Sequence, residues 1–259
     1  MALPDPKIRI QRLFNRIAVP YTRWALSRAR AETRRDAEWI RVQGHERVLD
    51  LACGPGTLGL ELAGQARAVY GLDLADRMIA QARRAAAAAR CAHAHFGVAD
   101  GELLPLPTDS FDLVTCSYSF ANFPAPQRVV EEMHRVTRPG GRIAVLEVVA
   151  PENAAQRQLL NRLERLRTRV PTRILCLTDL LALFYQVNLH LVDCQVQQRR
   201  RRLDDWLALA ESGGDRRTRR RLRQELLRTA KTNDPGWHLS RQGGRWFFYH
   251  TVARLLWRK

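Results

Sequence analysis

Three aspartates stand at the ends of apolar runs in the middle of the chain. Asp50 lies inside the run 48–51, Asp73 closes a second run, and Asp100 follows a third. A carboxylate at the end of a strand is placed to accept hydrogen bonds from ribose hydroxyls. One such carboxylate alone could be a helix cap or a solvated charge, but three at successive strand ends are hard to explain in that way, and Asp73 is the one that predicts a contact with a ribose.

A glycine-containing turn follows the first of these runs. The segment Ala52-Cys53-Gly54-Pro55-Gly56-Thr57 joins a predicted strand to a predicted helix. Glycine lets the backbone approach a ligand closely, and a helix amino terminus adds a partial positive charge. The spacing is neither the GxGxxG of dinucleotide-binding folds nor the lysine-containing phosphate loop. The turn therefore predicts a ligand contact without indicating a pyrophosphate.

Strand and helix patterns alternate between residues 47 and 150. Strands are predicted at 47–51, 68–73, 93–98, 111–116 and 142–149. Helices are predicted at 57–63, 75–90 and 125–137, and the segment Arg138-Pro139-Gly140-Gly141 is expected to end the last helix and form a turn. Alternation of this kind predicts a doubly wound α/β fold with a parallel sheet.

The two flanks are predicted to be mainly helical. Apolar residues recur at helical spacing from Ile10 to Ile17, which predicts a packed or lid helix, with a membrane-surface anchor as the alternative. Further helices are predicted at 154–169, 178–187 and 215–231, and two late strands at 191–197 and 245–256.

The motifs of the middle segment resemble those of the class I S-adenosylmethionine (SAM) methyltransferases, and among them the ubiquinone/menaquinone C-methyltransferase-like group of small-molecule methyltransferases. The resemblance covers residues 48–150 nearly continuously and becomes looser beyond them. Ala52 departs from the glycine that many members have at this position, although alanine is a common variant there. The segments that carry the resemblance are 50–56, Asp73-Leu74 with Met78, 98–112, Phe120-Ala121-Asn122-Phe123 and 135–141.

The resemblance implies a Rossmann-like seven-stranded sheet, mostly parallel with an antiparallel C-terminal strand. It also implies N-terminal helices and a helical insert after the fifth strand. On this basis we expect a lid and acceptor region at 1–46 and a SAM-binding core at 47–150. Residues 151–259 are then expected to hold an acceptor-binding insert and the closing strands of the same domain.

SAM is the cofactor that the resemblance implies, with S-adenosylhomocysteine as its product. Asp50 would hold the ammonium group of the methionine part directly or through water, Asp73 the ribose, and Asp100 the adenine. The other residues expected to bind the cofactor are Ala52, Cys53, Gly54, Gly56, Leu74, Met78, Gly101, Ser117 and Asn122.

Few residues are candidates for a catalytic base. Methyl transfer from a sulfonium needs a base only when the acceptor must lose a proton; otherwise, positioning supplies much of the rate. Tyr21, after the first helix, and His250, in a late predicted strand, are the candidate catalytic residues. Asn122, which follows the fourth strand, is expected to contact the cofactor or the acceptor. No metal constellation is visible, so no metal is expected.

The formal charge of +17 lies on the flanks, since residues 48–150 carry a net charge of −2. A positive field attracts anions, which suggests an acceptor with an anionic part, although only three of the 43 basic residues are lysine and a coding bias toward arginine is the alternative. The runs Arg199–Arg202 and Arg216–Arg223 are interpreted as a solvated helix face and turn. We expect a small acceptor that resembles a quinone, a polyketide or an isoprenoid.

Two other functions compete with this interpretation. The basic flanks alone would suit an RNA or DNA methyltransferase, although no recognised nucleic-acid module is present. A protein of this fold could also act as a cyclase or a binding protein without methyl transfer. The five scattered cysteines and the lack of a long apolar run or a secretory signal predict a cytoplasmic protein without disulfides or a membrane span.

Overall fold

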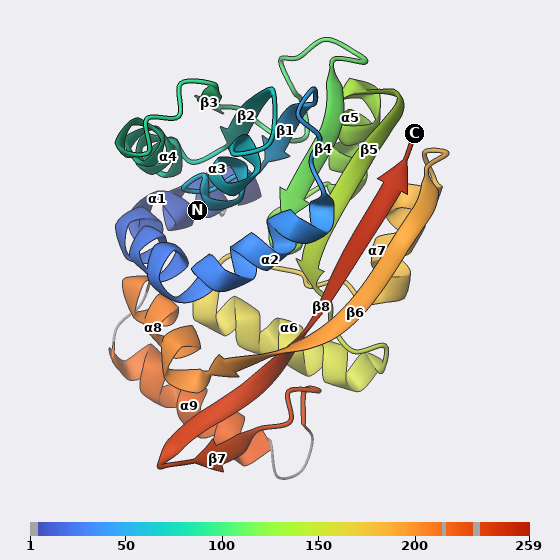
Figure 1. Cartoon of the computed structure of the whole chain (residues 1–259). Helices are drawn as coiled ribbons and strands as arrows, with labels where there is room; N and C mark the ends of the chain where they lie inside the picture. Colours follow the sequence, from blue (N-terminus) through green and yellow to red (C-terminus); the bar gives the residue numbers. More distant parts are fainter. Residues whose placement is uncertain (1–4, 214–215, 230–233) are drawn as a thin grey trace.

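A mixed β-sheet forms the centre of the structure, a computed structural model that describes residues 5–213, 216–229 and 234–259 (Figure 1). The strand order is β3-β2-β1-β4-β5-β8-β6. Strands β1 to β5 are parallel, and β8 is antiparallel to both of its neighbours. The bounds are β1 (Arg47–Leu51), β2 (Ala68–Asp73), β3 (Ala94–Val98), β4 (Phe111–Ser117), β5 (Thr137–Val148), β6 (His190–Arg202) and β8 (Arg245–Arg258).

This sheet confirms the predicted Rossmann-like fold with its antiparallel C-terminal strand. A short strand that was not predicted, β7 (Ser240–Gln242), pairs with β8 beside the main order. Strand β5 begins five residues earlier than predicted, so the segment expected to be a turn belongs to the strand. There Gly140 has a φ of +76°, and its N–H donates to the carbonyl of Lys259 at 2.9 Å. The end of β8 thus holds this segment in the sheet.

Helices cover both faces of the sheet, which is why its central strand β4 is buried at every residue but the last. On one face, α5 (Pro126–Val136) and α7 (Leu177–Tyr185) share an apolar core with β1, β4, β5 and β8. On the other face, α2 (Arg30–Ile40) and α3 (Thr57–Ala63) pack on the central strands. Helix α4 (Asp76–Ala88) packs beside β2 and β3.

Asp5 is the N-cap of helix α1 (Pro6–Trp24), and its carboxylate accepts a hydrogen bond from the N–H of Lys7. The apolar stripe of α1, with Ile10 and Ile17, packs against Met78 of α4, as a packed helix requires. The chain then passes through a π-helical turn (Ala25–Ala29) into α2. Within the described ranges, none of the helices combines the length and the apolar character needed to span a bilayer.

The long ribbon of β6 and β8 runs past the sheet and carries a second group of helices (Figure 1). These are α6 (Ala154–Thr168), α8 (Leu203–Gly213) and α9 (Arg216–Thr229). The three helices form a second apolar core with Trp237 and with Phe248 of β8, and α8 contributes Trp206 to it. Helix α8 was not predicted. Helix α9 corresponds to the helix predicted at 215–231, of which residues 215 and 230–231 lie outside the described residues.

The interpretation of the first arginine run as a solvated helix face and turn is wrong. Residues 199–202 form the end of β6 and pair in register with residues 247–250 of β8. Arg199 is 8% exposed, and its Nη2 lies 2.5 Å from Oδ1 of Asp36, while Arg201 pairs with Glu32 at 2.5 Å. The strand forms here because acids on α2 neutralise its arginines.

In the second run, Arg220, Arg221 and Arg223 are exposed on α9, as predicted.

Asp36 joins three elements, because its buried carboxylate also accepts hydrogen bonds from Arg254 of β8. We expect Asp36→Asn to lower the free energy of unfolding by about 3 kcal/mol, since removing one partner leaves buried charge uncompensated. Urea unfolding measures the change. The control is Glu38→Gln, whose pair with Arg34 is exposed and should contribute less than about 0.5 kcal/mol. Equal losses in the two variants would contradict this account.

Candidate functional site

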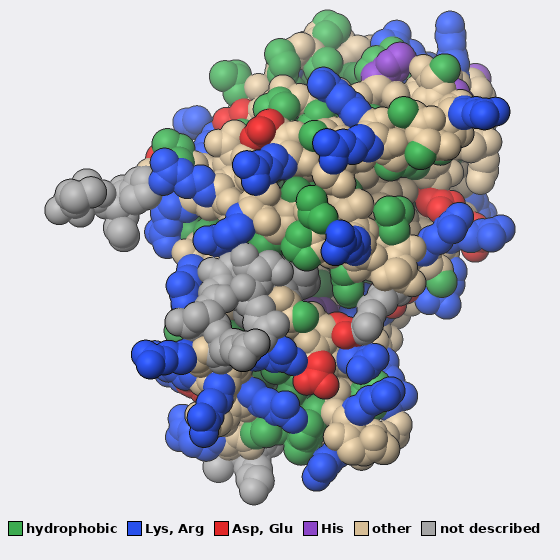
Figure 2. Space-filling view, turned by 90° about the vertical axis from the view of Figure 1, so that its left-hand side faces the viewer, with side chains coloured by type: hydrophobic (Ala, Val, Ile, Leu, Met, Phe, Trp, Pro, Cys, Tyr) green, Lys and Arg blue, Asp and Glu red, His purple; other side chains and the backbone are tan. Residues whose placement is uncertain are grey.

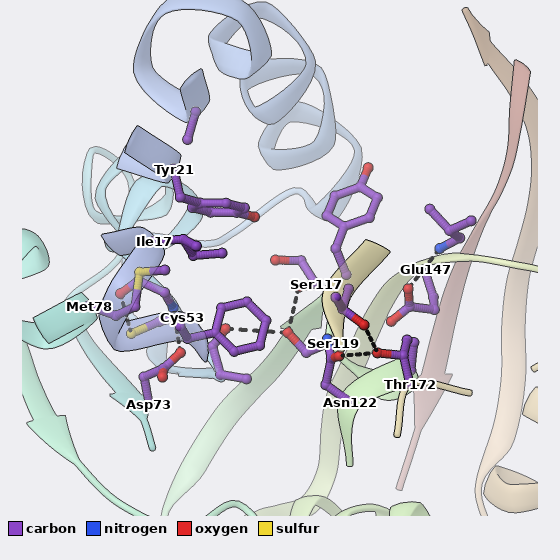
Figure 3. Close-up of a pocket in the computed structure, with 18 of the residues that line it drawn as sticks. Ile17, Tyr21, Cys53, Asp73, Met78, Ser117, Ser119, Asn122, Glu147 and Thr172 are labelled. Atoms are coloured by element: carbon purple, nitrogen blue, oxygen red, sulfur yellow. Dashed lines mark hydrogen bonds between the residues drawn. The ribbon is translucent and has the colours of Figure 1, made fainter. Parts of the chain in front are cut away.

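A cavity of about 680 Å³ lies at the carboxyl edge of the parallel strands. The loops after β1 to β4 form one wall, and residues of β5, α6, β6 and β8 form the other, with α1 beside both (Figure 3). Ligands of doubly wound sheets bind at this edge, and the volume falls in the range of small-molecule sites.

The glycine turn after β1 forms the floor of the first wall. Ala52, Gly54 and Gly56 all have a positive φ, of +52°, +55° and +77°. A Cβ atom added at Gly54 would meet nothing within 4 Å, whereas one at Gly56 would lie 2.9 Å from the ring of Phe96. Gly54 therefore leaves open space where it lines the cavity, while Gly56 lets the turn pack against the protein.

Asp73 ties this turn to the start of α4. Its Oδ2 accepts the N–H of Gly54 and its Oδ1 accepts the N–H of Ala75, both at 2.8 Å. Removal from water raises the pKa of this carboxyl, although the two hydrogen bonds oppose the rise. Asp73 lines the cavity beside the apolar side chains of Leu74 and Met78. An acid next to two apolar side chains is a suitable surface for a ribose joined to a flat base.

Lys7 of α1 closes the far end of this wall. Its Nζ lies 2.6 Å from Asp100 and 2.6 Å from Glu102. Burial alone would lower the pKa of Lys7, but the hydrogen bonds and charges of the two carboxylates raise it overall. Sequence reasoning missed this residue, although its being one of three lysines in an arginine-rich chain was a usable signal.

Two of the predicted cofactor-binding residues do not reach the cavity. Gly56 packs on Phe96, and Asp50 is fully buried below the turn. The Asp50 carboxylate accepts the N–H of Gly59 at 3.0 Å and the hydroxyl of Thr115 at 2.9 Å, and burial raises its pKa to about 7. The hydrogen bond from Gly59 shows that Asp50 stabilises the start of α3. The structure brings the other predicted residues together on the cavity walls: Tyr21, Ala52, Cys53, Gly54, Asp73, Leu74, Met78, Asp100, Gly101, Ser117, Asn122 and His250.

Polar residues after β4 separate the two walls. Ser119 donates its hydroxyl to the carbonyl of Ser117 at 2.9 Å, and the hydroxyl of Thr172 donates to Oδ1 of Asn122 at 3.4 Å. Figure 3 shows Ser117, Ser119 and Asn122 between Glu147 and the group of Tyr21, Met78 and Asp73, with Thr172 below Glu147. Hydrogen-bonding groups thus lie in the middle of the cavity.

The two predicted catalytic residues line the cavity, but neither is poised to take up a proton near neutral pH. Burial raises the pKa of Tyr21, so its hydroxyl stays protonated. Burial, with the positive charges of Arg201 and Arg167, lowers the pKa of His250 to about 3. Tyr21 can donate a hydrogen bond or pack on a ligand, and His250 presents a neutral ring.

Glu147, at the end of β5, is a cavity residue that sequence reasoning missed. It is 3% exposed, and burial raises its pKa to about 7. Its Oε2 accepts the N–H of Phe120 at 2.7 Å, and its Oε1 accepts the N–H of Val148 at 2.9 Å. The signal that identified Asp50, Asp73 and Asp100, an acid at the end of an apolar run, also applies to this position.

Acidic side chains neutralise most of the arginines in the second wall. Arg167 pairs with Glu164 at 2.6 Å, and the pairs of Arg199 and Arg201 with α2 are described above. The ring of Trp206 lies 5.1 Å from the guanidinium carbon of Arg167. In the part of the chain that is described, no group of three or more His, Cys, Asp or Glu is placed to hold a metal ion.

Comparison with known proteins agrees with this geometry. A family model described as a methyltransferase domain matches residues 48–141. The chain is 43% identical to the demethylmenaquinone methyltransferase of Thermus thermophilus over 112 residues, which are 42% of this chain and half of that enzyme. It is 32% identical to the demethylmenaquinone methyltransferase of Geobacillus kaustophilus over 161 residues, which are 58% of this chain and 68% of that enzyme. The crystal structure of the YcgJ protein from Bacillus subtilis has the same fold, with a TM-score of 0.76, 24% identity and coverage of 86% of this chain and 95% of that one.

The contrast between the two glycines gives a test of the turn. We expect Gly54→Ala to lower the free energy of unfolding by about 1 kcal/mol, the cost of a left-handed backbone. Gly56→Ala should cost about 1–3 kcal/mol more, because the new methyl group would overpack the site against Phe96. Urea unfolding of both variants measures the difference. Equal costs would mean that the contact with Phe96 does not hold the turn.

Proposed function

Since the chain belongs to the class I SAM-dependent methyltransferases, we propose that it transfers the methyl group of SAM to a small organic acceptor held in this cavity. The family makes the protein an enzyme whose cofactor is SAM. The observation that carries the proposal is the continuity of the cavity. One wall has the acids and the glycine turn that suit the cofactor, and the other encloses space for a second molecule.

The first wall fits the cofactor in shape and chemistry. Gly54 leaves open space for the methionine part, and the Asp73 carboxylate faces the cavity where ribose hydroxyls would donate to it. Leu74 and Met78 offer apolar contact to an adenine, whose amino group would donate to Asp100. Asp50, from below the turn, would act on the ammonium group only through the backbone that it braces or through water.

Bound SAM supplies a methyl carbon made electrophilic by the positive sulfonium, which direct displacement transfers to the acceptor. The chain's own part is to hold the acceptor in line and to exclude water. Helix α1 covers the cofactor wall and is held to it by the ion pairs of Lys7 with Asp100 and Glu102. Tyr21 and Asn122 are placed to orient the two molecules against each other, and His250 lines the far part of the cavity.

The acceptor that these observations support best is an aromatic, quinol-like molecule. Ile174, Trp206 and Phe248 give the second wall an apolar surface, while Asn122 and Thr172 lie where polar substituents could bind. Two relatives methylate demethylmenaquinone by name, which favours a quinone-like acceptor over one that resembles a polyketide or an isoprenoid. An anionic acceptor has less support, because three of the five arginines that line the cavity, Arg167, Arg199 and Arg201, already pair with acids.

Nucleic acid is a weaker candidate for the same reason. The side of the molecule in Figure 2 carries many Lys and Arg side chains, but they are spread over the surface rather than gathered along a groove. Arg199 and Arg201 line the cavity and are engaged by Asp36 and Glu32. A dispersed positive surface contributes to solubility and attracts anions at long range, but it does not form a defined binding groove for a nucleic acid.

The cofactor role of Asp73 can be tested by calorimetric titration with SAM. We expect Asp73→Ala to weaken SAM binding by about 100-fold, which corresponds to about 3 kcal/mol, a typical value for hydrogen bonds to a charged group. The control is Asp76→Ala, which removes the same charge from an exposed site three residues later. Equal affinity in the Asp73→Ala variant and the control would exclude the role.

The acceptor can be tested with demethylmenaquinol, prepared by chemical reduction of the quinone. The wild-type protein with SAM should add one methyl group per S-adenosylhomocysteine formed, as measured by mass spectrometry. Asp73→Ala should lose the reaction at limiting SAM. Turnover without a gain in mass would point to a cyclase, and methyl incorporation into added RNA or DNA instead would overturn the proposal.

A further inference from the structure

We propose that Glu147 is the proton acceptor of the methyl transfer, and that the acceptor therefore carries a weakly acidic O–H, as phenols and quinols do. This inference rests on the proposed function and names the substrate class of the same site. Its basis is the position, the hydrogen bonds and the unpaired charge of this one carboxylate.

Glu147 lies on the second wall of the cavity, opposite the cofactor wall. It ends β5, the strand beside β4, and it follows the buried residues 143–146 of the core. Figure 3 shows it across the cavity from Tyr21, Met78 and Asp73, with Asn122 and Thr172 near it. A molecule lying in front of the cofactor wall would meet this carboxylate.

Three backbone N–H groups, those of Phe120, Val148 and Ser119, fix the carboxylate and oppose the rise of its pKa. Phe120 donates to Oε2 and Val148 donates to Oε1. A carboxylate has about four acceptor directions, so one remains open beside these three donors. The side chain is thus held in one orientation and can still accept a proton from a ligand.

Glu147 also differs from the other acids of the cavity in its charge partners. Among the described residues, no lysine, arginine or histidine nitrogen lies within ion-pair distance of it. Most of the other cavity acids have such a partner: Glu32 with Arg201, Asp36 with Arg199 and Arg254, Asp100 and Glu102 with Lys7, and Glu164 with Arg167. Asp73 has none, but it lies on the cofactor wall. Within the described part of the chain, backbone N–H groups alone stabilise the charge of Glu147, and a cation that enters the cavity, such as a sulfonium, would compensate it.

The surrounding groups support this assignment of the proton. Burial raises the pKa of Glu147 to about 7, which suits a base that works near neutral pH. His250, with its pKa lowered to about 3, would hold a proton poorly. The charge of Glu147 helps raise the pKa of Cys116, which is buried in the core below it. The titratable and charged groups that line this part of the cavity are Tyr21 on α1, Glu32 and Asp36 on α2, Tyr118 after β4, Glu164 and Arg167 on α6, Arg199, Arg200, Arg201 and Arg202 on β6, Asp205 on α8 and His250 on β8.

The step balances in atoms and charge. The Glu147 carboxylate takes the proton of the acceptor O–H, and an electron pair of the acceptor forms the new bond to the methyl carbon. The methyl–sulfur bond breaks and its pair goes to the sulfur, so that the sulfonium and carboxylate charges disappear together. The products are the methylated acceptor, S-adenosylhomocysteine with an uncharged sulfur, and protonated Glu147. Glu147 then releases its proton to water. Attack through oxygen or through a ring carbon uses the same proton removal first. After attack through a ring carbon, the product is a dienone, and the proton of the methylated carbon must then move to the oxygen to restore the aromatic quinol.

A purely structural role for Glu147, holding the turn at Phe120, makes a different prediction. Glu147→Gln keeps a carbonyl oxygen that can accept the N–H of Phe120, but it cannot take up a proton. If Glu147 is the base, the variant should lose about 100-fold to 1,000-fold in kcat/KM for demethylmenaquinol and keep its SAM affinity within about twofold. Loss of SAM binding together with activity would assign the residue to structure and overturn the proposal.

The pH profile of kcat/KM at saturating SAM provides the second readout. A base must be ionised to act, so wild-type activity should fall as the pH drops below about 7, and bound sulfonium can move this limb only to lower pH. Glu147→Gln should lack the limb. Glu147→Asp keeps a carboxyl group and should show the limb at a lower rate. The same limb in Glu147→Gln, or its absence in Glu147→Asp, would overturn the proposal.

A measurement without any acceptor separates this inference from the proposed function. In protein labelled with ¹³C at the glutamate carboxyl carbons, one resonance should titrate near pH 7 and be absent from Glu147→Gln. Asp50, which shares this pKa range, carries no such label. A Glu147 resonance that does not titrate in the neutral range would overturn the inference even if the quinol is methylated. Failure of the quinol alone would overturn only the proposed acceptor.

Discussion

The geometry of the site depends on three carboxylates that lack a cationic partner among the described residues and are held by backbone N–H and hydroxyl donors. Asp50 binds Gly59 and Thr115, Asp73 binds Gly54 and Ala75, and Glu147 binds Phe120 and Val148. Each stands at the end of a parallel strand, where a loop begins. Asp73 and Glu147 therefore fix loops that follow neighbouring strands, and Asp50 fixes the start of α3. Desolvation raises all three pKa values, so the edge of the sheet favours a positively charged ligand.

The arginines serve a different purpose in the same molecule. Asp36 accepts hydrogen bonds from Arg199 of β6 and Arg254 of β8, while Glu32 holds Arg201. These pairs join α2 to the ribbon that carries the insert, and they close the cavity on the side away from the glycine turn. Because these pairs neutralise Arg199 and Arg201 locally, they reduce the positive charge that the arginine run brings to the site.

Local sequence signals predicted the core well. The bounds of β1, α3 and β2 agree with the predicted ranges. The glycine turn separates β1 from α3, and an apolar run that closes on Asp73 marks β2. Most of the predicted cofactor-binding residues also meet on one wall. Asp50 does not, because the same spacing that places an acid at a strand end allows it to turn inward to Gly59.

The misjudged features depend on contacts distant in sequence. Arg199 is far from Asp36 along the chain, so nothing near the arginine run indicated a strand. Glu147 has the same local pattern as the three aspartates, but only the fold shows that the end of β5 faces the cavity. The position of Lys7 against Asp100 likewise needs the packing of α1 on α4.

A crystal structure with bound S-adenosylhomocysteine tests the central claim most directly. The account predicts ribose hydroxyls within hydrogen-bonding distance of Asp73 and a sulfur atom that faces the space lined by Glu147. A product bound away from Asp73, or a sulfur atom separated from Glu147 by protein, would contradict it.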